Sequence, residues 1–179
     1  MKKSLLTLLI LCSTLVINAQ EKEQDLQENP FYAKHEVKLN ALLLVVGSFE
    51  VGYEYLLDEE SGLGISVFLP YDKDIKDDIS YYVSPYYRYY FGKKYASGFF
   101  LEGFGMLNRV DREVDFIIDD GEDNWVTDFA LGIGLGGKWV TKKGLIGEIN
   151  FGIGRNLFES GETDYDFIGK FGITVGYRF

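Results

Sequence analysis

Seven charged residues recur on one side of segments in which polar and apolar residues alternate: Glu54, Arg88, Glu102, Lys138, Glu148, Lys170 and Arg178. If these segments enclose an interior, unpaired charges inside it would be costly, so the acids and bases should pair and hydrogen-bond. The sequence therefore predicts a structural ion-pair network, in which the partners for Glu102 and Glu148 are Arg88, Lys138 or Lys170. The alternative chemistry for such a set is a gate or a small conduction path.

A second set of candidate ligands lies in the acidic segment 110–124, where four carboxylates flank Gly121: Asp119, Asp120, Glu122 and Asp123. Hard divalent cations such as calcium take several oxygen ligands from carboxylates and carbonyls. The spacing does not match an EF-hand loop, so the simpler interpretation is a solvated acidic loop that repels anions and resists aggregation. Cation-bridged contact with anionic lipopolysaccharide is a related hypothesis.

Other catalytic and binding chemistries find little support. His35 is the only histidine, and it lies at the start of the first predicted strand, away from the long loops. Hydrolytic sites need a base beside a nucleophile, so we expect an interfacial or solvated imidazole and no enzyme activity. One His and one Cys nearly exclude ordinary zinc sites, and no cofactor is expected. Gly132, Gly134 and Gly136 recur at period two with no helix after them, unlike a nucleotide-binding loop.

Composition bounds the class of protein further. The 179 residues suit one domain, and their 46% apolar content is too high for a disordered chain. The 28 acidic and 18 basic residues give a net charge of -10, which argues against a nucleic-acid partner. Abundant Gly, Tyr and Phe beside only 3 Pro favour strands and tight turns.

The N-terminal segment has the organisation of a secretory signal peptide. Lys2 and Lys3 precede an apolar run over 5–17, and cleavage is expected after Ala19 or Gln20. A transmembrane anchor, the alternative, needs about 20 apolar residues. The predicted organisation is a cleaved, Sec-type signal peptide at 1–20, a short polar lead-in at 21–35, and one domain at 36–179.

Alternation at period two dominates the chain after residue 35, which is typical of half-buried strands. The clearest example is the last segment, where Phe171, Ile173 and Val175 share one face with Tyr177 and Phe179. Pro85, inside a predicted strand, indicates a bulge or a bend. Short turns alternate with longer connections, the pattern of transmembrane barrels. The eight predicted strands are 36–46, 48–57, 62–70, 79–91, 96–109, 125–141, 144–157 and 165–179.

Alternation alone does not decide which face is inside. Eight strands leave an interior that side chains only just fill, so a face rich in Phe, Tyr, Leu and Ile would overfill it. The polar face is mostly Gly with few charges, whereas a soluble barrel needs abundant charge outside. Trp125 and Trp139 bracket one strand on the same face, about 35 Å apart along the barrel axis, which suits two interfacial aromatic girdles. These arguments favour a membrane barrel with a filled polar lumen. The alternative is a soluble, lipocalin-like periplasmic barrel that binds an apolar ligand.

The signal peptide, the eight alternating segments and the ending Val-Gly-Tyr-Arg-Phe over 175–179 resemble small outer-membrane β-barrels of the OmpA/OmpX type, and more closely a family of short envelope barrels of unknown function. The resemblance covers residues 36–179. It implies an all-β, eight-stranded antiparallel up-and-down transmembrane barrel in the outer membrane of a Gram-negative bacterium, with a structural or surface-interaction role and no catalytic residues.

The same resemblance implies partners and an orientation. The partners are the lipid bilayer and the barrel-assembly machinery, which would read the last strand through Phe179 and the alternating residues before it. Both ends of such barrels lie in the periplasm, so the longer connections, which are the acidic ones, would face outward. Tyr177 and Phe179 would then join Trp125 and Trp139 as membrane-interface aromatics.

Overall fold

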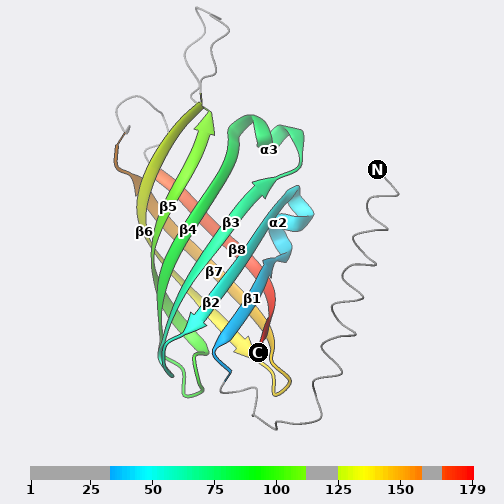
Figure 1. Cartoon of the computed structure of the whole chain (residues 1–179), viewed down its shortest axis with the longest axis vertical. Coiled ribbons are helices and arrows are strands. Elements are labelled where there is room, and N and C mark those ends of the chain that lie inside the picture. The colour runs from blue at the N-terminus through cyan, green and yellow to red at the C-terminus, as the bar shows by residue number, and fades with distance from the viewer. Residues whose placement is uncertain (1–32, 112–124, 159–166) are drawn as a thin grey trace, which may run out of the picture.

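The computed structural model describes residues 33–111, 125–158 and 167–179. Within them, eight strands form one closed antiparallel barrel, in which each strand pairs with its sequence neighbours and the last pairs with the first (Figure 1). This confirms the predicted fold class. The predicted signal peptide at 1–20 and most of the lead-in lie outside the described residues. The strands are β1 (His35–Asn40), β2 (Ser48–Leu56), β3 (Ser61–Pro70), β4 (Ile79–Tyr90), β5 (Gly98–Asp111), β6 (Trp125–Val140), β7 (Leu145–Asn156) and β8 (Phe167–Arg178).

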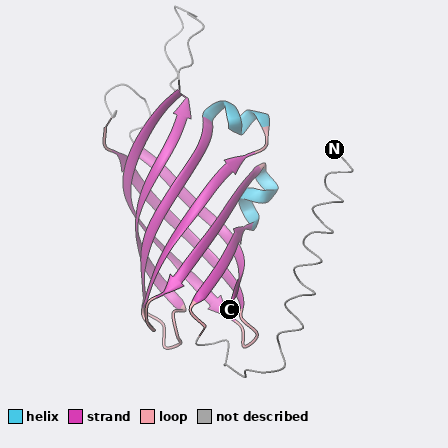
Figure 2. Ribbon diagram, viewed as in Figure 1, coloured by secondary structure: helices cyan, strands magenta, loops and turns pink. Residues whose placement is uncertain are grey.

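Two short helices lie at the end of the barrel opposite the short turns (Figure 2). They are α2 (Ala41–Val46), between β1 and β2, and α3 (Lys73–Asp78), between β3 and β4. In the part of the chain that the structure describes, no helix is long and apolar enough to cross a membrane.

The predicted first strand, 36–46, is wrong over 41–46, where the chain forms helix α2. The run over 41–46 is apolar at every position, so a continued strand would have pointed Leu42, Leu44 and Val46 into a polar lumen. Instead the Asn40 side chain accepts a hydrogen bond from the Leu43 N–H at 3.3 Å and begins a helix. Gly47 ends it with φ 118°, a conformation that favours glycine. Segment 71–78, expected to be a loop, contains α3 with Asp72 as its N-cap.

The turn between β4 and β5 is wider than predicted. Ala96 and Ser97, expected within a strand, are buried in a turn that folds beneath the short-turn end of the barrel. The Ala96 N–H donates to the Glu59 carbonyl at 2.7 Å, which ties this turn to the β2–β3 turn. At Pro85, where the sequence indicates a bulge or a bend, the pairing with β5 shows no bulge. The register is the same on both sides of Pro85, and it shifts between Ile79 and Tyr81 instead.

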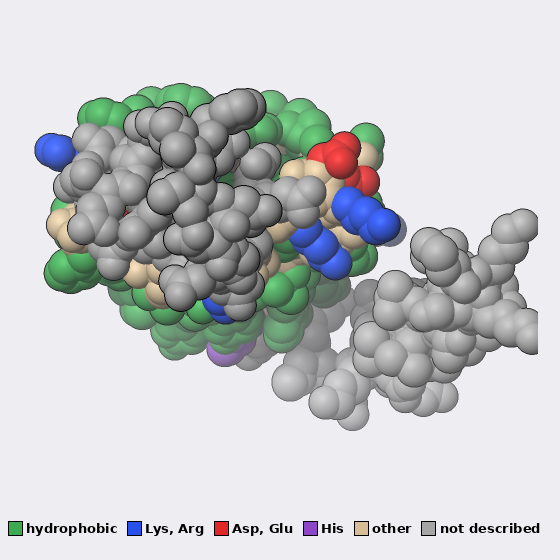
Figure 3. Space-filling view, turned by 90° about the horizontal axis from the view of Figure 1, so that it is seen from above, with side chains coloured by type: hydrophobic (Ala, Val, Ile, Leu, Met, Phe, Trp, Pro, Cys, Tyr) green, Lys and Arg blue, Asp and Glu red, His purple; other side chains and the backbone are tan. Residues whose placement is uncertain are grey.

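The outward face of the strands is apolar, and the inward face is buried. Along β3, Leu63, Ile65 and Val67 are exposed, whereas Ser66 and Phe68 are buried. Seen from the end that carries α2 and α3, hydrophobic side chains occupy much of the rim of the molecule, and acidic and basic side chains gather on one side of it (Figure 3). The barrel therefore encloses its charged groups and has its apolar groups outside, which is the distribution predicted for a membrane barrel.

The lumen is more aromatic than predicted. The expectation that bulky residues all face outward is wrong for β3, β4 and β5, which send six rings inward: Phe68, Tyr82, Tyr86, Tyr90, Phe100 and Phe104. Phe100 and Phe104 fit because the neighbouring strand β6 has glycine opposite each of them. A Cβ at Gly132 would collide with the Phe104 ring, and one at Gly136 with the Phe100 ring. Large side chains on β5 thus occupy the space that glycines leave free on β6.

Candidate functional site

The Arg88 guanidinium lies at the centre of a buried ion-pair network in the lumen. Its Nε donates to Glu102 Oε2 at 2.7 Å, and its Nη1 donates to Glu148 Oε2 at 2.8 Å and to Glu54 Oε2 at 3.2 Å. The same group lies 4.5 Å from the ring centroid of Tyr86. Arg88 on β4 therefore joins β5, β7 and β2 across the interior, using the fork of donors that a guanidinium offers.

Two lysines extend the network toward β1 and β6. Lys38 pairs with Glu54, with Glu148 at 3.0 Å and with Glu36 at 3.1 Å. Lys138 donates to Glu36 Oε2 at 2.9 Å. Both ammonium groups are buried, so each needs several oxygen partners to offset its lost hydration, and each has them.

The remaining two cations connect to the same carboxylates. Lys170 on β8 donates to Glu102 Oε1 at 2.8 Å, and Arg178 Nε donates to Glu36 Oε1 at 2.8 Å. The structure thus brings together all seven residues singled out in the sequence, and the partners of Glu102 and Glu148 include Arg88. Five buried cations pair with four buried glutamates in this part of the lumen: Lys38, Arg88, Lys138, Lys170 and Arg178 with Glu36, Glu54, Glu102 and Glu148.

The sequence reasoning missed several members of the network. Glu36 and Lys38 share the inward parity of β1, and Tyr86 and Tyr90 stand two residues on either side of Arg88. The Tyr90 hydroxyl donates to Glu54, and the Lys138 ammonium donates to the Tyr90 hydroxyl at 2.6 Å. Strict counting at period two identifies all four positions.

The short-turn end of the lumen is closed. Leu56, Tyr90, Ala96 and Phe100 form a buried apolar cluster there. Arg178 donates to the carbonyl oxygens of Tyr95 and Ala96, at 3.0 and 2.9 Å, and so holds the β4–β5 turn under the barrel. On the other side of Arg88 a polar cavity of about 20 Å³ is large enough for about one water molecule. Its lining includes Lys38, Asn40, Glu50, Ser66, Arg88, Lys170 and Thr174.

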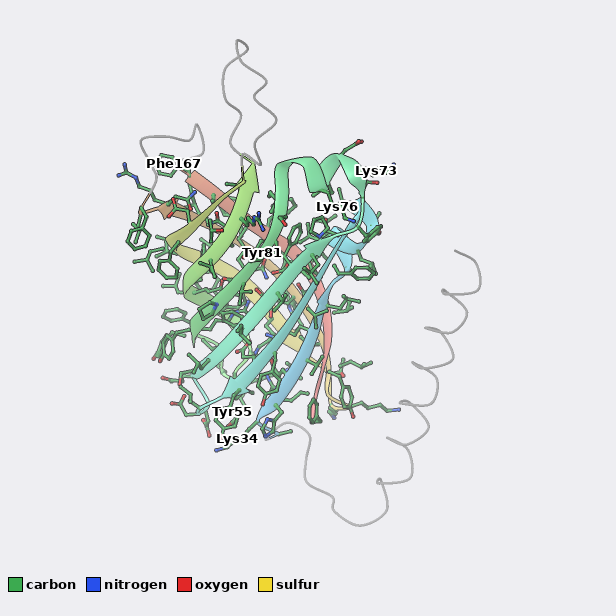
Figure 4. All side chains as sticks on the ribbon, turned by 45° about the horizontal axis from the view of Figure 1, so that its top comes forward. Lys34, Tyr55, Lys73, Lys76, Tyr81 and Phe167 are labelled. Atoms are coloured by element: carbon green, nitrogen blue, oxygen red, sulfur yellow. The ribbon has the colours of Figure 1, made fainter. Side chains whose placement is uncertain are left out.

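Aromatic side chains gather at both ends of the outer surface. Trp139 is 61% exposed near the end of β6, whose first residue is Trp125. His35 is exposed and stacks on Phe179 at a centroid distance of 5.9 Å, with Nδ1 2.6 Å from the Tyr53 hydroxyl. Figure 4 separates the two ends, with Lys34 and Tyr55 at one and Lys73, Lys76 and Phe167 at the other. The exposed aromatics include Tyr53, Tyr55, Tyr89, Phe91, Phe99, Trp139, Tyr177 and Phe179 at the first end, and Phe49, Tyr71, Phe158 and Phe167 at the second.

The candidate cation ligands Asp119, Asp120, Glu122 and Asp123 lie outside the described residues. Among the residues that are described, no group of three or more His, Cys, Asp and Glu side chains is arranged to hold a metal ion.

Charges inside, apolar groups outside and eight closed strands define the class: the fold of a small outer-membrane β-barrel. The chain is similar to the N-terminal β-barrel domain of Pseudomonas aeruginosa OprF, with 14% identity and a TM-score of 0.59 over 82% of this chain and 98% of that one. Neisserial surface protein A (NspA) and Yersinia pestis Ail are also 14% identical, with TM-scores of 0.49 and 0.41, over 82% of this chain and 96% and 99% of theirs. The first of these similarities supports the fold.

The family follows from the sequence itself. The chain belongs to the family described as protein of unknown function (DUF3575), whose model matches residues 5–173. Among proteins with curated descriptions, none matches.

Proposed function

We propose that this protein is an integral outer-membrane β-barrel with a structural or surface-interaction role in the cell envelope and no catalytic activity. The observation that carries the proposal is the inverted distribution of polarity. Arg88, Lys138 and Glu54 are buried in the lumen, whereas Ile133 on the outer face of β6 is 73% exposed. In water such a surface would aggregate, but in a bilayer it faces lipid hydrocarbon. The soluble lipocalin-like alternative needs the opposite arrangement.

A structural or interaction role fits the closed lumen better than transport does. The ion pairs occupy the interior, and the apolar cluster around Tyr90 and Phe100 seals one end of it. Buried carboxylates that are paired with arginine and lysine are poorly placed to act as acids or bases on an outside substrate. The parts left to meet partners are then the two ends of the barrel. By resemblance to small outer-membrane barrels, assembly would proceed through β8, and the short turns would face the periplasm.

Envelope fractionation tests the proposal, with the protein run boiled and unboiled on a denaturing gel. We expect a band in the outer-membrane fraction whose mobility shifts on boiling. A band in the soluble periplasmic extract that does not shift would overturn it.

A pair of substitutions on one strand sharpens the test. Ile133→Arg places a charge at the middle of the outer face of β6 and should cost about 2–4 kcal/mol of stability in lipid vesicles. Thr127→Arg, on the same face near the end of the strand, should cost at most about 1 kcal/mol, because the penalty falls toward the interface. Equal costs at the two depths would contradict a lipid-facing surface.

A further inference from the structure

An apolar groove runs over β5, β6 and β7 on the outer surface near the short-turn end. Gly137 on β6 pairs with Phe99 on one side and with Ile149 on the other. Because Gly137 has no side chain, the half-exposed Phe99 and Ile149 side chains stand as two walls above a low floor. The Trp139 indole lies over this floor, since a Cβ on Gly137 would come within 3.2 Å of its ring. The groove has a volume of about 460 Å³.

A basic pocket adjoins the groove at the rim of the barrel. It has a volume of about 260 Å³, and its lining includes Lys93, Lys94 and Ser97 of the β4–β5 turn. Gly98 and Trp139 line both the pocket and the groove, so the two are continuous. Lys93 and Lys94 are exposed, and neither has an ion-pair partner within the part of the chain that the structure describes. Two uncompensated positive charges therefore stand at the mouth of an apolar groove.

The chemistry of the combined site selects its ligand. The lysines attract an anion such as a phosphate group, and the groove accepts a hydrocarbon chain. An exposed tryptophan between them is typical of the boundary between headgroups and acyl chains. We propose that the pocket and groove bind one anionic phospholipid of the leaflet at the short-turn end, with its phosphate at Lys93 and Lys94 and an acyl chain along the groove past Trp139. This inference rests on the proposed membrane location.

The fluorescence of Trp139 can report a bound lipid. The chain has two tryptophans, so Trp125→Phe leaves Trp139 as the single indole fluorophore. This variant is placed in phosphatidylcholine nanodiscs that contain a rising fraction of phosphatidylglycerol brominated in the upper acyl chain. Bromine quenches a neighbouring indole, so we expect half-maximal quenching at a several-fold lower fraction of brominated phosphatidylglycerol than of brominated phosphatidylcholine.

Two pairs of variants locate the effect. K93Q/K94Q should remove most of this several-fold preference for phosphatidylglycerol, while K142Q/K143Q, in the neighbouring β6–β7 turn and outside the pocket lining, should leave it nearly unchanged. Gly137→Leu fills the groove and should weaken quenching by both lipids. Gly147→Leu, at an outward position with open space, should not.

The outcomes separate this inference from the proposed function. Equal quenching by the two lipids, or equal losses in K93Q/K94Q and K142Q/K143Q, would overturn the site and leave the membrane location standing. A protein that does not enter nanodiscs, or whose Trp139 neither lipid quenches, would overturn the membrane location as well.

Discussion

The seam between β1 and β8 and the wall of β5 and β6 close the same barrel in different ways. In the wall, pairing runs without interruption from Gly98 opposite Lys138 to Asp111 opposite Trp125. In the seam, β1 pairs with β8 only from Glu36 opposite Arg178 to Asn40 opposite Thr174. Beyond Thr174, the edge of β8 has no strand partner on the β1 side among the described residues, and helix α2 packs beside it instead (Figure 1).

The difference shows that side chains compensate where backbone pairing is short. At the seam, Glu36 binds Arg178 and Lys138, and the Asn40 side chain donates to the Phe171 carbonyl at 3.2 Å. In the wall, glycines on β6 let the strands pack against large rings from β5. The seam therefore depends on a few charged contacts, and the wall depends on packing.

Glu36→Gln tests the seam most directly and should have the largest effect on stability. It removes the carboxylate that binds Arg178, and a buried charge left without its partner costs about 3–5 kcal/mol. We expect amide exchange in β1 and β8 to accelerate before the rest of the barrel unfolds. The matched change in the wall, Glu102→Gln, should also destabilise, but exchange in β5 and β6 should rise only with global unfolding. Identical exchange patterns in the two variants would refute a weak seam.

Gly132→Val tests the packing of the wall and should rank second. Its side chain would enter the space of the Phe104 ring and come near the Ile153 carbonyl, 2.7 Å from the Cβ position. Overpacking of this kind costs about 1–3 kcal/mol, measured as a lower midpoint of denaturant unfolding in vesicles. Gly147→Val is the control, because nothing lies within 4 Å of its Cβ position. A destabilisation as large in the control would mean that any side chain, not lumen crowding, is the cause.

The sequence predicted the wall well and the seam poorly, for physical reasons. Alternation at period two identifies β5, β6 and β7 because each is a long strand with one lumen face and one outer face. The apolar run over 41–46 carries no such alternation, and its helical state depends on a cap at Asn40 and on the edge of β8, distant in sequence. The inward rings of Phe100 and Phe104 were missed for a similar reason. Whether a large residue fits the lumen depends on the glycine opposite it, which only the strand register reveals.

Leu43→Ser tests whether α2 closes the seam, with a smaller expected effect. Leu43 packs against the apolar cluster of the lumen that includes Phe68 and Met106. Its partial burial should limit the loss to about 1–2 kcal/mol, below the about 2–5 kcal/mol of a fully buried leucine. Exchange should increase around Phe171 on β8. Val45→Ser, at a position that is 86% exposed, is the matched control and should leave exchange at β8 unchanged.

Substitution of Asp58, in the β2–β3 turn, should have the smallest effect on stability. This turn and the β4–β5 turn close the short-turn end of the barrel and link the seam to the wall. The Glu60 N–H and the Ser61 hydroxyl, each 2.8 Å away, donate to the Asp58 carboxylate and hold its pKa below the usual range. A lowered pKa in the folded state adds stability above the unfolded-state pKa of about 4, and this stability is lost as pH falls through the folded pKa. The same turn accepts the Ala96 N–H through the Glu59 carbonyl, and the Ala96 carbonyl accepts from Arg178 at the seam.

Asp58→Asn should therefore destabilise slightly at pH 7 and not at all at low pH, where the wild-type carboxyl is itself protonated. Unfolding midpoints and the exchange rate of the Ala96 amide, followed from pH 7 down to about pH 2, give the measurement. If the difference between the two proteins does not shrink on acidification, the carboxylate charge is not what orders the turn. If the Ala96 amide and the amides of β1 and β8 respond while those of β5 and β6 do not, the turn acts on the seam through Ala96 and Arg178, independently of the wall.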